Sequence, residues 1–393
     1  MGNGRILHLA TNEKFIDHAY ISFENVAPGK NDFYVFIADD GDYIKLTPHT
    51  EVRYRDRLGA KLGNDIGQYD FVVVHSMHPF WISVINSVKK KITYVWVGWG
   101  YDYYDIIYPD KNQLLLESTK RDKETYGSSV APTKRKFHLL TFIRSVIERL
   151  VLDPDKTAAI QKMTYFSPVL PNEYALVRRT FQGNSFPQEI QWNYGSLEEV
   201  LLKGFLGKTI TGRNVLVGNS ASNTSNHMDI LGWLSKQRPS MEGRKTICPL
   251  SYGDQAYAQR VREFGESAMG ESFDPLIDFV SLSDYLNIVS SCSHLLMNHV
   301  RQQGVGNIII MLYLGAMVFL REENPAYHYF KGLGFHISTI QELQSNPGLL
   351  NLSLDSTQRQ RNIDLLFAIW SKDAIDRKTS QLMEAAMSSP TPA

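Results

Sequence analysis

Four short apolar runs in the first hundred residues constrain the fold more than any other feature of this sequence. Each run is apolar on consecutive positions and rich in β-branched or aromatic residues, which is typical of strands covered on both faces of a parallel sheet. The runs are Arg5–Ala10 (RILHLA), Phe33–Ala38 (FYVFIA), Phe71–His75 (FVVVH) and Thr93–Val97 (TYVWV). Between the last two, Pro79–Lys91 has apolar residues at helical spacing and ends in three lysines, which suit the negative end of a helix dipole. The alternation predicts βαβ units.

The same alternation returns after residue 210. Five further apolar runs predict strands with helices between them: Asn214–Val217, Thr246–Leu250, Phe279–Leu282, His294–Met297 and Met317–Leu320. Residues 173–209 lose the pattern and mix Gly, Pro, Asn and Gln with scattered aromatic residues, which indicates a linker or excursion. We therefore expect an α/β protein with two Rossmann-like domains facing a cleft, in which ligands bind. The predicted boundaries are 1–175 (first domain), 176–209 (linker or insertion), 210–360 (second domain) and 361–393 (C-terminal helix and tail).

Charge and cysteine content exclude several classes of function. The chain of 393 residues has 41 basic and 41 acidic side chains, so no overall field attracts nucleic acid, and an electrostatic partner must meet a local patch. Cys248 and Cys292 show neither metal-ligand nor disulfide-framework spacing, so we predict buried thiols and no metal site. The apolar run Ile308–Leu320 is shorter than the roughly 20 residues of a membrane-spanning helix. We expect a protein that is neither exported nor transmembrane.

A small polar loop follows the NVLV strand and precedes a predicted helix. Val217–His227 reads VGNSASNTSNH, and such a loop exposes backbone N–H groups and hydroxyls of the kind that bind a phosphate or diphosphate. Its crowded amides and hydroxyls favour an anion site, although a helix start capped by Ser or Asn is the alternative. The sequence has no GxxxxGK[ST] motif, so this loop is not a P-loop.

Two further loops follow predicted strands of the second half. In Asn298–Asn307, Arg301 is suited to clamp a phosphate, and Gly304 and Gly306 allow a backbone to approach a ligand at a helix start. A turn with solvated amides is the alternative. Arg321–Pro325 (REENP) places carboxylates where they accept hydrogen bonds from sugar hydroxyls. An acidic helix N-terminus before the proline is the competing interpretation.

An aromatic loop follows the fourth strand of the first half. Trp96–Asp105 (WVGWGYDYYD) combines spaced glycines, aromatic rings and two carboxylates, a combination that holds pyranose rings and deprotonates a hydroxyl. A packed aromatic loop with surface aspartates is the alternative. His75, at the end of the FVVVH strand, and His18, after the first strand, are additional candidates, although each alone is more often structural.

Residues 131–150 (APTKRKFHLLTFIRSVIERL) form a basic segment with apolar residues at three- and four-residue spacing. This pattern predicts an amphipathic helix that lies either on anionic lipid or on the domain core. The residues that would contact the membrane are Lys134, Arg135, Lys136 and Arg144.

Four strings of the second half, in this order, resemble a known family. They are VGNS with its Ser/Asn-rich continuation to His227, CPLSYG at 248–253, RQQGVGN at 301–307 and REENP at 321–325. The sequence resembles the bacterial 4-acetamido-4,6-dideoxygalactose (Fuc4NAc) transferases of enterobacterial common antigen synthesis, the TDP-N-acetylfucosamine:lipid II N-acetylfucosaminyltransferase or 4-alpha-L-fucosyltransferase family. In the first half the likeness extends to His75 and to a WGxDxY pattern from Trp99 to Tyr104.

The resemblance implies a two-domain glycosyltransferase of the B type that is inverting, metal-independent and without a cofactor. Its second domain would bind a dTDP-sugar and its first an undecaprenyl-diphosphate-linked glycan, as a peripheral protein at the cytoplasmic face of the bacterial inner membrane. The loops of the first domain diverge from this family, so an enzyme of O-antigen or capsule assembly is an alternative. A nucleotide-sugar epimerase of the same fold and a non-catalytic scaffold at the membrane surface are two competing interpretations.

Motifs and resemblance together predict three sets of site residues. In direct displacement a base removes the acceptor proton while helix N-termini and a cation stabilise the departing diphosphate. The predicted base is Asp102, with His75 or His18 as the next candidates. The donor sugar or its deoxyribose would contact Glu322, Glu323 and Asn324. The residues predicted to bind the donor nucleotide and its diphosphate are Gly218, Asn219, Ser220, Asn223, Tyr252, Arg301, Gln303, Gly304, Gly306 and Asn307.

Overall fold

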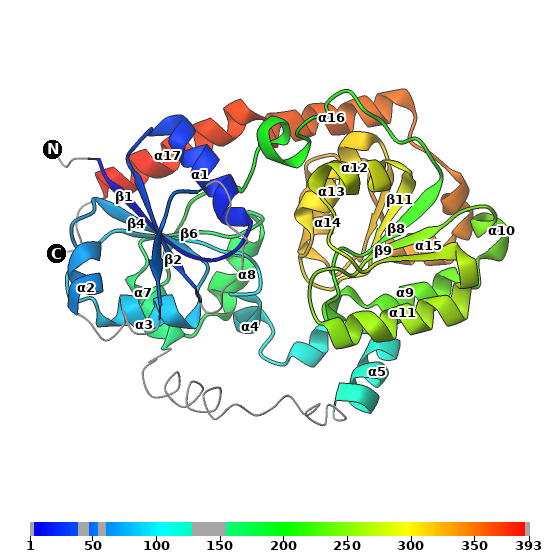
Figure 1. Ribbon diagram of the computed structural model, residues 1–393, viewed down its shortest axis with the longest axis horizontal. Helices are drawn as coiled ribbons and strands as arrows, with labels where there is room; N and C mark the ends of the chain where they lie inside the picture. Colours follow the sequence, from blue (N-terminus) through cyan, green and yellow to red (C-terminus); the bar gives the residue numbers. More distant parts are fainter. Residues whose placement is uncertain (1–3, 38–46, 54–59, 128–154, 390–393) are drawn as a thin grey trace. The chain divides into compact units, whose positions relative to one another are not determined.

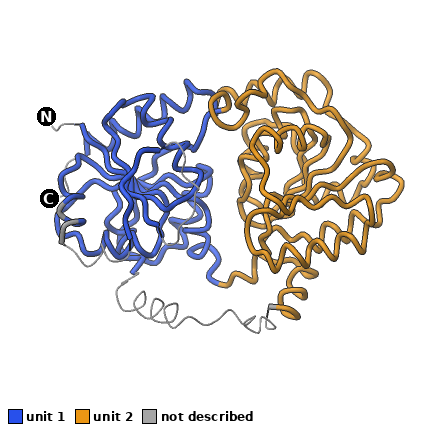
Figure 2. The backbone as a smooth tube through the Cα atoms, viewed as in Figure 1, with its two compact units in different colours: residues 1–109, 132–196, 370–393 blue, residues 110–131, 197–369 orange. Residues whose placement is uncertain are grey.

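The computed structural model describes residues 4–37, 47–53, 60–127 and 155–389 of the chain. The chain divides into two compact units, each with its own parallel sheet (Figures 1 and 2). Unit 1 comprises residues 1–109, 132–196 and 370–393, and unit 2 comprises residues 110–131 and 197–369. The α/β class predicted from the sequence is confirmed.

Unit 1 is built, in its described residues, on a seven-stranded parallel sheet with the order β3-β2-β1-β4-β5-β6-β7. Its central strands are continuous apolar runs because both faces are covered, and β4 and β5 are buried at every position. The strand order reverses between β1 and β4, which is the topological switch point of the sheet. The strands are β1 (Ile6–Thr11), β2 (Asn31–Phe36), β3 (Thr50–Val52), β4 (Phe71–His75), β5 (Tyr94–Val97), β6 (Tyr165–Ser167) and β7 (Gln188–Glu189).

Helices flank the sheet of unit 1, and the C-terminal helix returns to it. Helix α17 lies beside α1 (Figure 1). Its Leu382 and Ala386 share one buried cluster with Ile16 and Phe23 of α1. The described helices are α1 (Phe15–Val26), α2 (Ala60–Ile66), α3 (Pro79–Ser87), α4 (Tyr104–Ile107), α7 (Lys156–Lys162), α8 (Glu173–Thr180) and α17 (Lys372–Ser388).

Unit 2 contains a six-stranded parallel sheet in the order β10-β9-β8-β11-β12-β13, counted over the described residues. This order reverses between β8 and β11, so unit 2 has the same doubly wound topology as unit 1. The strands are β8 (Asn214–Val217), β9 (Thr246–Pro249), β10 (Phe273–Leu276), β11 (Cys292–Met297), β12 (Met317–Leu320) and β13 (Ser338–Thr339).

Helices follow most strands of unit 2, as doubly wound topology requires. A further helix of unit 2, α5, comes from the segment 110–131, before the strands of this unit, and packs against α9 (Figures 1 and 2). The helices are α5 (Glu117–Gly127), α9 (His227–Leu234), α10 (Arg238–Met241), α11 (Gln255–Met269), α12 (Leu282–Ser290), α13 (Val305–Leu314), α14 (Pro325–Gly332), α15 (Ile340–Ser345) and α16 (Ser356–Trp370), which ends at the boundary of the units.

Most predicted strands are present within two residues, but the strand predicted over Phe279–Leu282 is wrong. The strand in that part of the sheet is β10, and it contains Pro275, which an edge strand tolerates. Phe279 is 85% exposed. Ser281 instead caps α12, because its hydroxyl accepts a hydrogen bond from the Asp284 N–H at 3.1 Å.

The linker predicted over 176–209 differs from the structure. Helix α8 and strand β7 lie within unit 1, and β7 pairs with β6, so ordered structure of that unit continues to residue 196. In the described part of the predicted C-terminal helix and tail (361–393), residues 361–370 belong to α16 and Lys372–Ser388 form α17. Helix α8 and strand β7 give no strong periodic pattern because both are short, and β7 is the edge strand of its sheet.

The helix predicted over Pro79–Lys91 is shorter in the structure and does not include the three lysines. Helix α3 ends at Ser87, before Lys89. The cation at its last carbonyls is Lys162 of α7, whose Nζ donates to the carbonyls of Ile85 and Asn86 at 2.9 Å each. A residue distant in the sequence therefore stabilises this helix end.

The structure also addresses two predictions from the sequence, one about membrane-spanning helices and one about the burial of the two cysteines. In the described part of the chain, every helix is too short or too polar to span a bilayer. Cys248 and Cys292 are both buried and free, and burial raises the pKa of each thiol.

Candidate active site

Three loops of unit 2 leave neighbouring strands at the carboxyl edge of its sheet. They comprise residues 218–226, 298–304 and 321–324, which follow β8, β11 and β12. The first two loops flank the switch point between β8 and β11, where doubly wound sheets bind their ligands. The fold thus brings together three segments that were selected from the sequence one by one.

Gly218 and Gly304 have left-handed backbone conformations, with φ of +68° and +64°. A Cβ at Gly304 would lie 2.6 Å from Met297 Cε and 2.8 Å from Asn219 Cγ, so no other residue fits there without displacement. Gly304 also caps α13, whose first N–H groups have no partner within the helix. At Gly306 a Cβ would meet nothing nearer than 3.7 Å, so the close approach predicted for both glycines applies to Gly304.

Gln303 joins the two loops at the switch point. Its Nε2 donates to Asn219 Oδ1 and to Ser220 Oγ, both at 3.1 Å, and its Oε1 accepts from Thr224 Oγ1 at 2.9 Å. The half-buried Arg301 donates from Nε to the same threonine hydroxyl at 3.4 Å. These contacts hold one guanidinium and several hydroxyls and amides around the start of α13, a set of groups suited to a diphosphate.

The other predicted diphosphate residues lie around these loops. Asn307 is in the first turn of α13 and donates its N–H to the Gly304 carbonyl at 2.9 Å. Tyr252 follows β9, where its carbonyl accepts the Ala221 N–H at 2.7 Å and its side chain is 57% exposed. Asn223 begins a single helical turn inside the loop after β8.

Among the buried polar atoms of these two loop regions, Asn223 Oδ1, His227 Nε2 and His299 Nδ1 have no hydrogen-bond partner in the described residues. Burial lowers the pKa of His227 to about 3, and burial together with Arg301 holds the pKa of His299 well below its usual value. Each unpaired buried group costs about 1–3 kcal/mol, so native proteins retain few. Their concentration here is a second indication of a ligand site.

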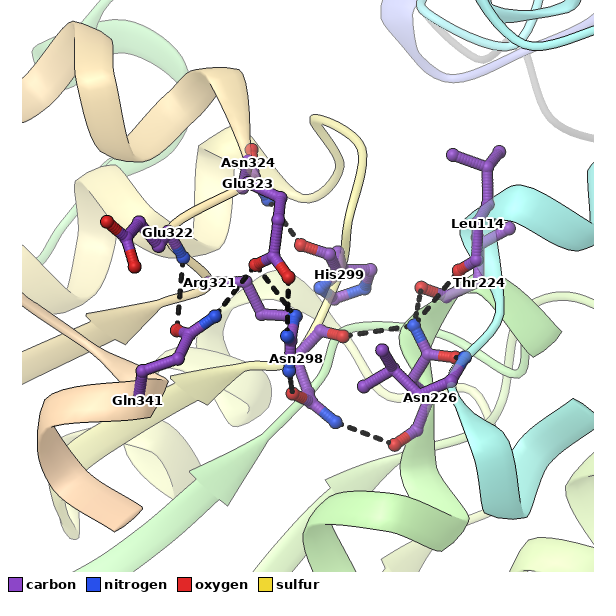
Figure 3. Close-up of polar contacts among 11 residues, drawn as sticks. Leu114, Thr224, Asn226, Asn298, His299, Arg321, Glu322, Glu323, Asn324 and Gln341 are labelled. Carbon is purple, nitrogen blue, oxygen red and sulfur yellow. Dashed lines mark hydrogen bonds and ion pairs between the residues drawn. The ribbon is translucent and has the colours of Figure 1, made fainter. Parts of the chain in front are cut away.

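Asn226 is a residue whose role could not be identified from the sequence. It is buried and has φ of +52°, a conformation that asparagine tolerates better than most residues. Its Nδ2 donates to the carbonyls of Leu114 and Asn298, both at 3.1 Å (Figure 3). Its Oδ1 accepts from the Leu116 N–H at 2.8 Å. Asn298 Nδ2 returns a bond to the Asn226 carbonyl at 3.1 Å. This amide pair fixes the loops after β8 and β11 relative to each other.

The loop after β12 contains an ion pair at its surface. Arg321 donates to the Glu323 carboxylate at 2.7 and 3.1 Å, and Gln341 Nε2 adds a bond at 2.8 Å (Figure 3). Burial acts to raise the pKa of Glu323, but the Arg321 and Gln341 bonds leave it below its usual value, so this carboxylate is charged at neutral pH. The exposed Glu322 donates its backbone N–H to Gln341 Oε1 at 3.1 Å. Both carboxylates lie at the carboxyl edge.

Asn324, predicted to contact the donor sugar, is engaged inside the protein. Its Oδ1 accepts from the Ala326 N–H at 2.8 Å and caps α14, and its Nδ2 donates to the carbonyls of His299 and Arg301 (Figure 3 shows the His299 bond). The side chain joins the loops after β11 and β12. Glu322 and Glu323 remain as the candidates for sugar contact in this loop.

In unit 1, Asp102 is buried beneath the turn after β5. Its Oδ2 accepts from the Met77 N–H at 2.9 Å and from Trp96 Nε1 at 2.8 Å, and its Oδ1 accepts from the Trp99 N–H at 2.7 Å. Burial raises the pKa of Asp102, although these three bonds oppose the shift. Because protein donors occupy both carboxylate oxygens, Asp102 supports the turns after β4 and β5. It is therefore no longer the leading candidate for the base.

His75 is also buried with both ring nitrogens engaged. Its Nδ1 lies 2.6 Å from the Tyr194 hydroxyl and its Nε2 lies 3.0 Å from His8 Nδ1. Burial holds its pKa well below the usual value. The structure thus gives His75 two protein partners and no exposed nitrogen.

His18 differs from both. It lies half-buried in the first turns of α1, after β1, and neither ring nitrogen has a hydrogen-bond partner among the described residues. Burial, assisted by the charge of Lys14, lowers the pKa of His18 to about 4. The imidazole is therefore neutral at pH 7 and able to accept a proton, which makes His18 the strongest of the three predicted bases.

Exposed aromatic rings begin next to His18, whose ring centroid lies 5.7 Å from that of Phe15. Phe15 of α1 is 38% exposed, Tyr101 is 52% exposed, and the half-buried Trp99 lies between them, with ring centroids 5.8 and 6.2 Å from theirs. We call Phe15, Trp99 and Tyr101 the aromatic edge. Ser76, with φ of +70°, forms a 2.9 Å hydroxyl contact with Tyr101. The aromatic edge lies after β1 and β5 and is chemically suited to the apolar face of a sugar ring.

The predicted membrane-contact residues, Lys134, Arg135, Lys136 and Arg144, lie outside the described residues. Their contact with an anionic surface stays a prediction.

A family comparison supports the interpretation of the motifs. Residues 206–341 match the model of the family described as 4-alpha-L-fucosyltransferase, glycosyl transferase group 56. This match covers most of unit 2, including all three loops, and it supports the suspected family. The epimerase and scaffold interpretations are set aside because the family is one of glycosyltransferases.

Structural comparisons define the fold. Sucrose-phosphate synthase from Thermosynechococcus elongatus matches with a TM-score of 0.64 and 10% identity, covering 97% of this chain and 98% of that chain. HepE from Anabaena, in complex with UDP and glucose, matches with a TM-score of 0.63 and 12% identity, covering 97% and 99%. A glycosyltransferase from Rickettsia africae matches with a TM-score of 0.59 and 10% identity, covering 98% and 100%. The fold is the two-domain glycosyltransferase-B type.

Proposed function

We propose that this glycosyltransferase, whose residues 206–341 match group 56, transfers a 4-acetamido-4,6-dideoxyhexose from a dTDP-sugar. The proposed acceptor is an undecaprenyl-diphosphate-linked glycan at the cytoplasmic face of the bacterial inner membrane. The product serves the synthesis of a cell-surface polysaccharide such as enterobacterial common antigen or an O-antigen. The proposal combines the family match with the site chemistry of the two units.

The donor diphosphate is assigned to unit 2. Its oxygens would accept hydrogen bonds from the N–H groups at the start of α13, and Arg301 would supply the positive charge. The observation that carries this assignment is Gly304, which starts α13 with a left-handed backbone and where a Cβ would lie 2.8 Å from Asn219 Cγ. Only glycine fits there, and it leaves the helix start accessible between the loops after β8 and β11. Glu322 and Glu323 are assigned to hydroxyls of the donor sugar or deoxyribose.

The acceptor is assigned to unit 1. We place its sugar ring against the aromatic edge, where exposed rings lie beside a neutral histidine. His18 would remove the proton of the acceptor hydroxyl as that oxygen forms a bond to the anomeric carbon of the donor. The bond from this carbon to the diphosphate oxygen breaks at the same time, which inverts the configuration. The leaving dTDP takes up the negative charge, stabilised by the α13 N–H groups and Arg301.

Product analysis tests the proposal. The full chain is incubated with dTDP-4-acetamido-4,6-dideoxygalactose and a lipid extract that contains undecaprenyl-diphosphate-linked glycans, and the lipids are analysed by mass spectrometry. We expect one added acetamido-dideoxyhexose per acceptor and release of dTDP. UDP-glucose in place of the dTDP-sugar is the matched control and should give no product. An unchanged lipid pool with active, folded protein would contradict the proposed donor and acceptor.

A further inference from the structure

Five side chains of unit 1 form one continuous hydrogen-bonded chain through its interior. Trp99 Nε1 lies 2.6 Å from the Tyr194 hydroxyl, which lies 2.6 Å from His75 Nδ1. His75 Nε2 lies 3.0 Å from His8 Nδ1, and His8 Nε2 lies 3.3 Å from Asn31 Oδ1. This series, which we call the histidine relay, starts at the half-buried Trp99 and crosses the buried strands β4 and β1 to reach β2.

The two ends of the histidine relay require the same direction of donation. At one end, the indole Nε1–H of Trp99 only donates, so the Tyr194 oxygen accepts from it and donates its own proton to His75 Nδ1. At the other end, Asn31 Nδ2 donates to Glu24 at 2.6 Å and to the Ala27 carbonyl at 2.8 Å, which leaves Asn31 Oδ1 to accept from His8.

The direction assigns one proton to each imidazole. His75 and His8 must both carry it on Nε2, because His75 Nδ1 accepts from Tyr194 and His8 Nε2 donates to Asn31. The single remaining bond, from His75 Nε2–H to His8 Nδ1, agrees with both assignments. Every ring nitrogen of the pair then has a partner, and neither ring carries a charge.

Packing supports a neutral, immobile pair. The His8 ring stacks on Phe33 with centroids 4.1 Å apart and planes 5° from parallel, and it meets the edge of Phe23 at 4.6 Å. Both histidines are fully buried. Burial lowers the pKa of His8 to about 3, so protonation does not interrupt the relay near neutral pH.

The relay ends at Trp99, a half-buried residue of the aromatic edge. Trp99 is held at two points: its backbone N–H binds Asp102 at 2.7 Å, and its indole N–H binds Tyr194. We propose that His8 and His75 are positioning residues, whose neutral relay through Tyr194 fixes the Trp99 indole on which an acceptor sugar stacks. The stacking part rests on the proposed function, whereas the relay itself does not.

Selective ¹⁵N-histidine labelling of the full chain tests the proton positions directly. We expect the Nδ1 atoms of His8 and His75 to show the chemical shift of an unprotonated nitrogen and the Nε2 atoms that of an N–H. His8→Phe and His75→Phe variants assign the signals. A protonated Nδ1 on either ring would overturn the relay.

Two variants break the relay at different points. His8→Phe keeps the stack on Phe33 and removes both hydrogen bonds of the ring, and Tyr194→Phe removes the hydroxyl that binds Trp99. We expect each to shift the Trp99 indole N–H resonance and to raise the acceptor KM about 10-fold, with the Kd for thymidine diphosphate unchanged. Phe23→Leu is the matched control, since it loosens the same core without removing a relay bond.

The outcomes separate the relay from the proposed function. An unmoved Trp99 resonance in both variants would overturn the relay, whether or not the chain transfers a sugar. A moved resonance with unchanged acceptor KM would overturn the positioning role. An equal rise of KM in Phe23→Leu would also overturn it, because general loosening of the core would then explain the effect.

Discussion

The carboxyl edges of the two sheets share a topology and differ in chemistry. In both units the strand order reverses between the first and the fourth strand in sequence order, and the candidate residues follow the strands around that point. Unit 2 presents glycines with positive φ, amides, hydroxyls and the start of α13. Unit 1 presents the aromatic edge and a neutral histidine above buried groups that are fully hydrogen-bonded.

This difference shows how one doubly wound frame serves two kinds of ligand. Backbone N–H groups that lack partners are suited to an anion. Within the described residues, unit 2 also retains buried side-chain atoms without a partner, such as His227 Nε2. Flat exposed rings are suited to a sugar and need rigid support, and in unit 1 the buried Asp102 and His75 near these rings are both hydrogen-bonded to other protein groups. The contrast predicts that substitutions in unit 2 act on nucleotide binding and those in unit 1 on acceptor use and turnover.

The largest effect is expected at His18. His18→Asn removes the proposed base while keeping a polar side chain, and loss of general-base catalysis typically costs about 100-fold or more in kcat. We expect that decrease with an unchanged Kd for thymidine diphosphate, measured by calorimetry. His328→Asn, on the exposed side of α14, is the matched control. A kcat within twofold of the unsubstituted protein would exclude His18 as the base.

The pH profile sharpens the same assignment. The pKa of His18 is lowered from 6.5 to about 4, so its neutral, proton-accepting form persists as the pH falls from 7 to 5. We expect kcat/KM to hold over that interval and to decline as the pH approaches 4. Protonation favours the unfolded chain, whose histidine binds the proton more tightly, so this group lowers stability below about pH 6.5. An acid limb centred near 6.5 would indicate a different base.

Gly304→Ala is expected to have the next largest effect. A Cβ there meets Met297 and Asn219 below 3 Å, and the left-handed backbone adds about 1–2 kcal/mol of strain. The loop must shift, and we expect thymidine diphosphate to bind about 100-fold more weakly, which is about 2.7 kcal/mol. Gly306→Ala is the matched control, because its Cβ has room and the helix start keeps its N–H groups. Equal losses in both variants would contradict the assigned role of Gly304.

Asp102→Asn tests the supporting role in unit 1. An amide supplies one acceptor oxygen where three N–H donors converge, and its own N–H₂ faces donors. We expect the free energy of unfolding to fall by about 2 kcal/mol. Urea denaturation followed by tryptophan fluorescence measures this change. Unaltered stability combined with lost turnover would contradict the supporting role and indicate Asp102 as the catalytic base.

Arg301→Ala is expected to have the smallest effect of this series. Losing one charge-assisted hydrogen bond of about 1.5 kcal/mol weakens thymidine diphosphate binding about 10-fold and reduces its dependence on salt. Arg262→Ala, which removes a surface pair with Glu266 on α11, controls for the loss of a positive charge. The same Kd in Arg301→Ala as in the unsubstituted protein would place the diphosphate away from this loop.

The sequence predicted the two sheets well because buried parallel strands are apolar at every position. The runs at β4, β8 and β12 coincide with the observed strands. The apparent linker failed for a tertiary reason. Glu173 is buried at its start, bound by the hydroxyls of Tyr103 and Tyr104 at 2.8 and 2.6 Å, and no local pattern reveals partners 70 residues away.

The site was predictable at the level of loops but not of individual roles. Gly304 and Gly306 look alike in RQQGVGN, and only the neighbours of each in space distinguish them. Asp102 and His18 were both plausible bases, and the distinction depends on which atoms already have partners. Asn226 carries no sequence signal beyond its residue type, although it joins two loops.

The central claim is that the loops after β8 and β11 of unit 2 bind the donor diphosphate. A crystal structure of the full chain with saturating thymidine diphosphate tests it most directly. We predict phosphate oxygens within hydrogen-bond distance of the N–H groups of Val305 or Gly306 and of the Arg301 guanidinium. A diphosphate bound at the aromatic edge of unit 1, or density elsewhere with these loops free of ligand, would contradict the account.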